Sequence, residues 1–195
     1  MNEKEPITEK EIAAVAGEIG VPYAALRAVI EIESRGRGFL ANGKPIVLFE
    51  RHWFHRLTKG QYANRPDISS RQPGGYAVGP NSEARGQAEW ARMMRAAELD
   101  WEAAMMSASW GLAQIMGFNF AACNCVTIDQ FVEEMQISER RQVELMAEFL
   151  QSRGLTDELQ RQDWAGFARV YNGPAFRQNK YDEKLAAAYA RFAKE

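Results

Sequence analysis

Apolar and polar positions alternate along most of this chain with the three-to-four-residue period of an amphipathic helix. Thr8 and Glu11 have the spacing of a capping box, and Gly20 follows the apolar positions that come after them. We therefore expect one helix from Thr8 to about Gly20 and a second from Pro22 to Ser34 or the next residue. Further helices are predicted at 51–57, 82–97, 101–108, 127–135, 138–154, 163–171 and 181–192.

A different pattern occupies residues 39–50. Two short apolar runs flank Asn42-Gly43, a dipeptide that favours a type I′ turn because it tolerates positive φ. We expect one small β-hairpin here, with Pro45 at an edge and Glu50 at the far end of the second strand. From about residue 60 to residue 79 the period is lost and Gly, Pro, Asn and Ser accumulate, which indicates a long loop.

The segment from Ser107 to Gly117 mixes small residues and glycine with Leu, Ile and Met. We expect a close-packed helix whose backbone approaches another helix or a ligand. Gln114 lies among apolar neighbours in this segment, so it needs hydrogen-bond partners if it is buried.

These elements predict a mainly α fold, a helical bundle with one small β-hairpin near residues 39–50. A chain of 195 residues is near the length of one domain and can bury a sizeable core. No repeat, linker or low-complexity segment divides it. We expect one domain over residues 1–195, with its core at about 8–192.

Charge and composition narrow the class of protein. The net charge of −2 argues against the broad basic surface of a nucleic-acid binder. The segment from Met1 to Pro6 is charged and lacks an apolar run, and no stretch approaches the roughly 18 apolar residues of a membrane span. We expect synthesis in the cytoplasm without a signal peptide, and no stable membrane insertion.

A metal site is not expected. Cys123 and Cys125 are too few for a disulfide framework, and their C-x-C spacing differs from that of zinc sites. His52 and His55 would be needed to complete a four-ligand set, and packing or surface roles fit them better. The sequence predicts neither a metal nor another cofactor.

Glu33 is the charged residue that fits its helix least well. Leu26, Val29 and Ile30 mark the apolar face of the second predicted helix, and Glu33 continues that face at the i+7 position. A carboxyl group forced toward a core either finds a partner or has a raised pKa, which a general acid needs. The alternative is that Glu33 ends the helix and accepts a hydrogen bond from a neighbour such as Ser34.

Three polar insertions, Glu33-Ser34, the block around Gln114, and Tyr171-Asn172-Gly173, resemble in order and spacing the motifs of the lysozyme-like lytic transglycosylase and goose-type lysozyme superfamily. The chain resembles one family within it more closely, the N-acetylmuramidase domain of bacteriophage endolysins, from about residue 8 to about residue 192. The blocks that carry this second resemblance are 33–36, 48–52, 109–119, 164–168 and 171–174.

The resemblance implies a lysozyme-like α+β fold and a monomeric enzyme that acts on the glycan strands of bacterial peptidoglycan. It assigns to Glu33 the protonation of the glycosidic oxygen between N-acetylmuramic acid and N-acetylglucosamine. By the same resemblance the substrate-binding residues are Ser34, Ser109, Gln114, Tyr171 and Asn172. Ala113 stands where relatives more often have Met, and Gly173-Pro174 replaces Ala-Gly; these departures affect subsite contacts more than chemistry.

A glycosidase usually needs a second carboxylate, and Glu50 is the candidate because the predicted hairpin delivers it to the groove. The alternative is that Glu50 pairs with Arg51 or His52 and shapes the cleft. Without a second carboxylate, attack by the substrate's own hydroxyl would give the anhydro product of a lytic transglycosylase. The resemblance implies hydrolysis by an endolysin that reaches the wall after membrane permeabilisation late in phage infection. A non-catalytic wall-binding module is a third interpretation, against which the intact Glu33-Ser34 pair argues.

Overall fold

The computed structural model describes residues 4–34, 37–174 and 176–194, with the side chain of Ser34 left out. The helices are α1 Glu9–Glu18, α2 Tyr23–Ser34, α3 Arg51–Leu57, α4 Ser82–Ala97, α5 Trp101–Met106, α6 Ile128–Met135, α7 Glu139–Ser152, α8 Thr156–Arg161, α9 Trp164–Tyr171 and α10 Tyr181–Phe192, with a 3₁₀ helix η1 at Gly117–Cys123. The strands are β1 Val47–Phe49, β2 Ala108–Trp110 and β3 Ile115–Met116. The mainly α prediction is confirmed, while η1 and α8 were not predicted.

Local signals explain where most helices begin. The predicted capping box is present at α1, where the Thr8 side chain accepts from the Glu11 amide and the Glu11 carboxylate accepts from the Thr8 amide. Side-chain caps also precede other helices and satisfy amides that have no partner within the helix. They are Asn81 for α4, Asp100 for α5, Thr127 for α6, Ser138 for α7 and Asp163 for α9.

The predicted helix over Ser107 to Gly117 is wrong, because this segment forms an antiparallel pair of strands. The three-stranded sheet has the order β1-β2-β3, with Leu48 opposite Ser109 and Trp110 opposite Ile115. Gly111 and Gln114, in the turn between β2 and β3, both have positive φ (66° and 48°), which an α-helix does not accommodate.

The predicted hairpin at residues 39–50 is present in a shorter form. Phe39 bridges to Pro45, and the Leu40 amide donates to the Lys44 carbonyl. Gly43 has positive φ but Asn42 does not, so the loop is a three-residue turn rather than a type I′ turn. β1 pairs with β2 instead of with residues 39–41. The long loop at 60–79 is confirmed, since no helix or strand falls within it.

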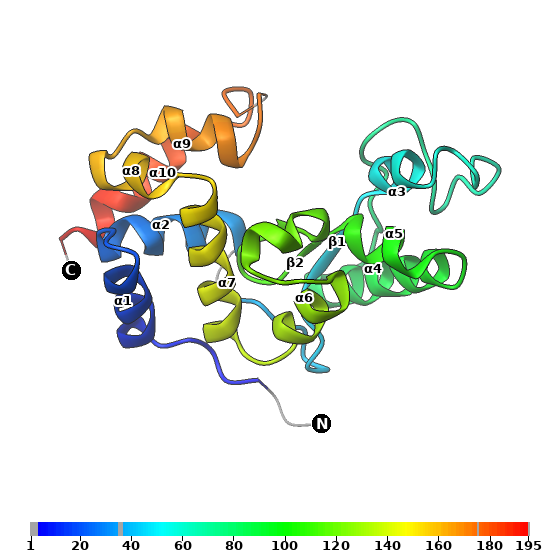
Figure 1. Cartoon of the computed structure of the whole chain (residues 1–195), viewed down its shortest axis with the longest axis horizontal. Helices are drawn as coiled ribbons and strands as arrows, with labels where there is room; N and C mark the ends of the chain where they lie inside the picture. Colours follow the sequence, from blue (N-terminus) through cyan, green and yellow to red (C-terminus); the bar gives the residue numbers. More distant parts are fainter. Residues whose placement is uncertain (1–3, 35–36, 175, 195) are drawn as a thin grey trace.

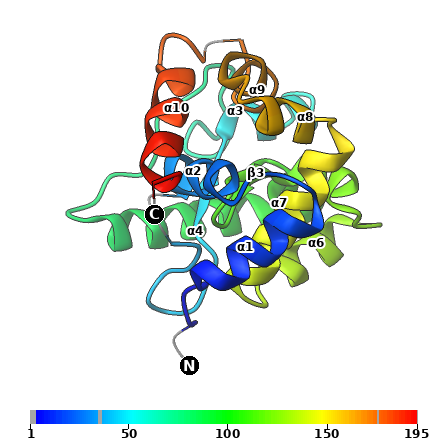
Figure 2. The same ribbon diagram turned by 90° about the vertical axis from the view of Figure 1, so that its left-hand side faces the viewer.

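Figure 1 shows two ends of the molecule joined through α7. Helices α1, α2, α8, α9 and α10 gather at one end, and the sheet with α3, α4, α5 and α6 lies at the other. The turned view in Figure 2 shows α10 beside α2 and α1 beside α7, and these pairs are in contact. No single helix of the described ranges is long and apolar enough to cross a membrane; α1 and α2 meet the length and composition requirement jointly but are bent by 116°.

Candidate active site

Glu33 lies in the last turn of α2, on the face predicted from its sequence. Leu26 and Val29 on that face are fully buried, and Glu33 itself is partly buried. Its Oε1 atom accepts a hydrogen bond of 2.8 Å from Nδ2 of Asn172, which follows α9. Burial raises the pKa of the Glu33 carboxyl to about 7, and the Asn172 bond opposes this shift because it favours the charged form. At neutral pH the group is therefore close to half protonated.

Two tyrosines lie near enough to Glu33 for its charge to affect them. Burial raises the pKa of Tyr171 well above its usual range, and the charge of Glu33 raises it further. Burial and Glu33 raise the pKa of Tyr181 in the same way. The Tyr171 hydroxyl donates to the carbonyl of Ala113 at 2.8 Å, so it ties α9 to the turn between β2 and β3. Both phenols stay neutral hydrogen-bonding groups around the carboxyl.

Gln114 has the partners that its apolar surroundings require. Its Oε1 accepts from the Ser109 hydroxyl at 2.9 Å, and its Nε2 donates to the Gly111 carbonyl at 2.9 Å. These bonds close the turn between β2 and β3, which carries the carbonyl bound by Tyr171. The predicted residues Ser109, Gln114, Tyr171, Asn172 and Glu33 are thus linked through this turn and α9. The side chain of Ser34 lies outside the described part of the structure.

The sequence did not reveal Gln142, a fully buried side chain on α7 that holds two loops of the site. Its Oε1 accepts from the Leu112 amide at 2.9 Å, and its Nε2 donates to the Met135 carbonyl at 2.9 Å and lies 3.5 Å from the Gly38 carbonyl. A Cβ atom at Gly111 would lie 2.6 Å from Cδ of Gln142. Gln142 therefore fixes the β2–β3 turn to α7 and requires glycine at position 111.

The buried side chain of Glu139 fixes the backbone that follows Glu33 to α7. Its Oε1 accepts from the Gly38 amide at 2.6 Å and its Oε2 from the Ile7 amide at 2.9 Å. In sequence Glu139 resembles an ordinary acidic residue in the first turn of a helix, so no local signal distinguishes it. It ties α7 to the N-terminal segment and to the backbone beyond α2.

Glu50 lies just before α3, and its side chain is 13% exposed. Oε1 accepts from the Tyr76 hydroxyl at 2.8 Å, and Oε2 lies 3.1 Å from Nδ1 of His52, an ion pair when the imidazole is protonated. The alternative pairing with His52 is therefore present, while the predicted partner Arg51 donates to the carbonyls of Gly74 and Pro66 instead. No contact within the described ranges joins Glu50 to Glu33.

A groove of about 440 Å³ opens beside Asn172, and we call it the Trp53 groove. The rings of Trp53 and Phe118 pack against each other with centroids 4.5 Å apart and form an aromatic wall. A pocket with apolar walls and a few polar groups is typical of a site for a small ligand or one unit of a polymer. The residues that line it are Trp53, Met116, Phe118, Asn119, Phe149, Arg153, Val170, Tyr171, Asn172 and Gly173.

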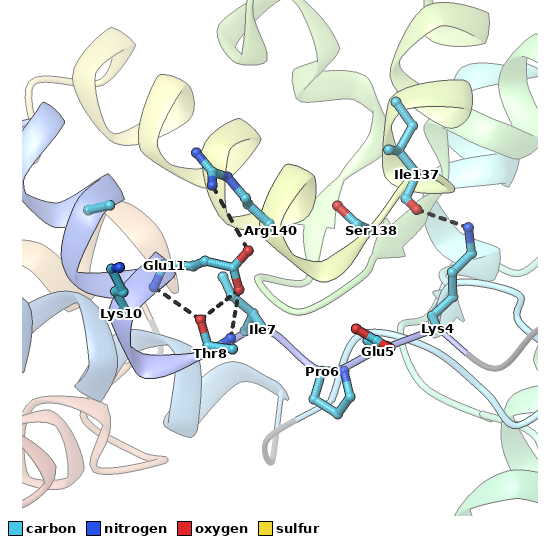
Figure 3. A pocket seen from close by; sticks show the side chains of 11 residues that line it. Lys4, Glu5, Pro6, Ile7, Thr8, Lys10, Glu11, Ile137, Ser138 and Arg140 are labelled. Atoms are coloured by element: carbon cyan, nitrogen blue, oxygen red, sulfur yellow. Dashed lines mark hydrogen bonds and ion pairs between the residues drawn. The ribbon is translucent and has the colours of Figure 1, made fainter.

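A larger cavity, of about 700 Å³, lies between the N-terminal segment and the start of α7 (Figure 3). Two of its basic residues are engaged within the protein: Lys4 donates to the Ile137 carbonyl, and Arg140 lies 3.9 Å from Glu11. Glu11 is also engaged in the capping box with Thr8. None of the predicted site residues lines this cavity, so its size does not make it the candidate site.

Within the described ranges, no group of three or more His, Cys, Asp or Glu side chains is arranged to hold a metal ion. Cys123 and Cys125 are both buried free thiols. Burial raises the pKa of Cys125 to about 11 and that of Cys123 higher still, so both stay as unreactive thiols at neutral pH.

Comparisons with known proteins show the family of the chain. A family model described as N-acetylmuramidase matches residues 22–193. The crystal structure of the Burkholderia AP3 phage endolysin is similar to the chain with a TM-score of 0.85 and 34% sequence identity, and the match covers 100% of this chain and 73% of that one. No curated protein matches the sequence. The family match spans most of the chain, so the chain belongs to the N-acetylmuramidase family of peptidoglycan-cleaving enzymes.

Proposed function

We propose that the protein hydrolyses the β-1,4 bond between N-acetylmuramic acid and N-acetylglucosamine in peptidoglycan, with Glu33 as the general acid. The observation that carries the proposal is the pKa of about 7 at a partly buried carboxyl group that is hydrogen-bonded to Asn172, a residue that lines an open groove. A general acid works best when its pKa lies near the working pH, because it is then protonated yet still acidic enough to donate.

The geometry around Glu33 supports a specific placement of the proton. Asn172 donates an N–H to Oε1, so that oxygen serves as an acceptor and the acidic proton belongs on Oε2. From Oε2 the proton passes to the glycosidic oxygen as the bond to the sugar carbon breaks. Asn172 then stabilises the carboxylate that remains, because its hydrogen bond is stronger to the charged form.

Several polar groups are available to orient the sugar. Oδ1 of Asn172 is buried and has no hydrogen-bond partner within the described ranges, which makes it a ready acceptor for the N–H of an acetamido group. Ser109 and Gln114 fix the neighbouring turn, and Tyr171 fixes the end of α9, which Asn172 follows. We propose that these residues, together with Ser34, bind the glycan.

For the second catalytic group we propose Glu50, acting as the base that activates water. Its side chain accepts a hydrogen bond from Tyr76 and lies beside His52, so its orientation is fixed. Glu50→Gln should then lower kcat by about 10²–10⁴-fold. Near-normal kcat in this variant would make Glu50 a residue that shapes the cleft, and anhydro products would then identify a lytic transglycosylase.

The similarity to a phage endolysin supports a wider role. We propose that residues 1–195 form one catalytic domain and act as a monomer in an endolysin that is made in the host cytoplasm and is active on the wall once the membrane has been permeabilised. Gel filtration would give the mass of one 22.0 kDa chain if this is right.

The proposal is tested by the loss of turbidity of purified peptidoglycan with the wild-type protein, Glu33→Gln and Glu31→Gln. Glu31 is the matched control, because it lies two residues away on α2 and forms an ion pair with Arg191 at the surface. Glu33→Gln should abolish lysis while Glu31→Gln retains it. Substantial lysis by folded Glu33→Gln would overturn the assignment, and binding to peptidoglycan without product from the wild type would indicate a wall-binding module.

A further inference from the structure

A cationic side chain faces the Trp53 groove without a carboxylate partner. Arg153 follows α7 directly, and its Nη2 donates to Oδ1 of Asn119 at 2.7 Å. Its guanidinium also lies over the Phe149 ring, 5.5 Å from the centroid. Asn119 and Phe149 line the same groove, and no carboxylate of the described residues lies within ion-pair distance of Arg153. The position of the charge is therefore set by groove residues.

Another arginine, within α7 itself, shows the opposite arrangement. Arg141 contacts Glu134 at 2.6 Å, Glu148 at 3.1 Å and Glu144 at 3.2 Å, so its charge is matched within the protein. Arg153 uses a single described hydrogen bond out of the five N–H donors of a guanidinium. Its remaining donors are available for an anion, and their planar fork suits the two oxygens of a carboxylate.

The chemistry of peptidoglycan supplies such a carboxylate. Its sugar rings are uncharged where the lactyl group is joined to a peptide, so the negative charges of the strand lie on the peptide stems. The Trp53 groove is lined both by Asn172, which holds Glu33, and by Arg153. We propose that Arg153 binds a carboxylate of the peptide stem, so that the enzyme prefers peptide-bearing glycan with free carboxyl groups. This inference rests on the muramidase function proposed above and adds to it a specificity for the stem.

The test uses soluble, uncross-linked peptidoglycan strands, with half of the batch converted to carboxamides by carbodiimide and ammonia. Arg153→Gln is compared with the wild type and with Arg140→Gln. Arg140 is the matched control, since it lies in α7, the helix that Arg153 follows, its substitution removes the same charge, and it lines the other cavity, where it pairs with Glu144 and Glu11. Thermal unfolding confirms that each variant is folded.

On untreated strands Arg153→Gln should lower kcat/KM about tenfold, through KM, as expected for one charge-assisted contact. On amidated strands the kcat/KM of the wild type should fall to the value of Arg153→Gln on untreated strands. The wild type and Arg153→Gln should then have the same kcat/KM on amidated strands. Arg140→Gln should behave like the wild type on both substrates. Equal activity of Arg153→Gln and the wild type on untreated strands would overturn the inference, and so would an equal loss on both substrates. If the wild type turned over neither the untreated nor the amidated strands, the muramidase function itself would be overturned instead.

Discussion

Asn172→Leu separates the two opposing influences on Glu33. Leucine has nearly the shape of asparagine but no N–H, so it removes the 2.8 Å bond to Oε1 and keeps the burial that raises the pKa. A hydrogen bond to a charged group contributes about 1.5–3 kcal/mol, and part of it persists when the acid is protonated. Because 1.36 kcal/mol corresponds to one pKa unit, the pKa of Glu33 should rise by about one unit.

The assay is the pH dependence of kcat/KM on soluble peptidoglycan strands. A general acid must be protonated, so activity declines as pH rises through its pKa, which places the basic limb of the wild type at about 7. In Asn172→Leu this limb should move to higher pH by about one unit, although the maximum rate falls because the carboxylate product is less stabilised. Asn119→Leu, which removes an amide from the same groove without touching Glu33, should leave the limb in place. An unmoved limb in Asn172→Leu, or one moved to lower pH, would refute the reasoning.

Three further predictions concern stability. The pKa of Glu33 in the folded protein exceeds its ordinary value of 4.5, so the contribution of this carboxyl to stability is full below pH 4.5 and is lost as pH rises through about 7. Glu33→Gln should therefore raise the free energy of unfolding, measured in urea, by up to about 3 kcal/mol at pH 8 and by little at pH 4. Gln142→Met should lower the free energy of unfolding by about 3 kcal/mol, because the Leu112 amide and the Met135 carbonyl are left buried without a hydrogen-bond partner. Gln151→Met, on the exposed face of α7, should lower it by less than about 0.5 kcal/mol. Gly111→Ala should destabilise by about 2 kcal/mol more than Gly154→Ala, since both have φ near 66° but position 154 is open to solvent.

Each of these has a contrary result. Equal stability of Glu33→Gln and the wild type at pH 8 would mean that the carboxyl is solvated. If the two glutamine variants, or the two glycine variants, lost similar free energies of unfolding, Gln142 would not be the side chain that fixes the β2–β3 turn.

The sequence predicted those parts of the fold that depend on local chemistry. Caps such as Thr8, Thr127 and Ser138 bind amides three residues away, so their signal is contained in a few letters of sequence. The prediction of a helix from Ser107 to Gly117 was wrong because short apolar runs do not distinguish a strand from a helix. What decides it is the positive φ of Gly111 and Gln114, which is stabilised by contacts with distant residues such as Gln142.

In the candidate site, too, the sequence revealed what depends on local pattern and did not reveal contacts between distant residues. Glu33 was visible because it breaks the apolar face of its own helix. Its partner Asn172 is 139 residues away, and only the resemblance to a known family brought the two together before the structure did. The bond from Tyr76 to Glu50 joins a loop without any periodic pattern to a residue just before α3, and nothing in the sequence marks it.

The most direct test of the central claim is the mass of the fragments released from purified peptidoglycan in heavy-oxygen water. The wild type should release muropeptides that end in reducing N-acetylmuramic acid carrying one heavy oxygen atom, and folded Glu33→Gln should release none. Anhydro ends, reducing N-acetylglucosamine ends, or the same products from Glu33→Gln would contradict hydrolysis of this bond with Glu33 as its proton donor.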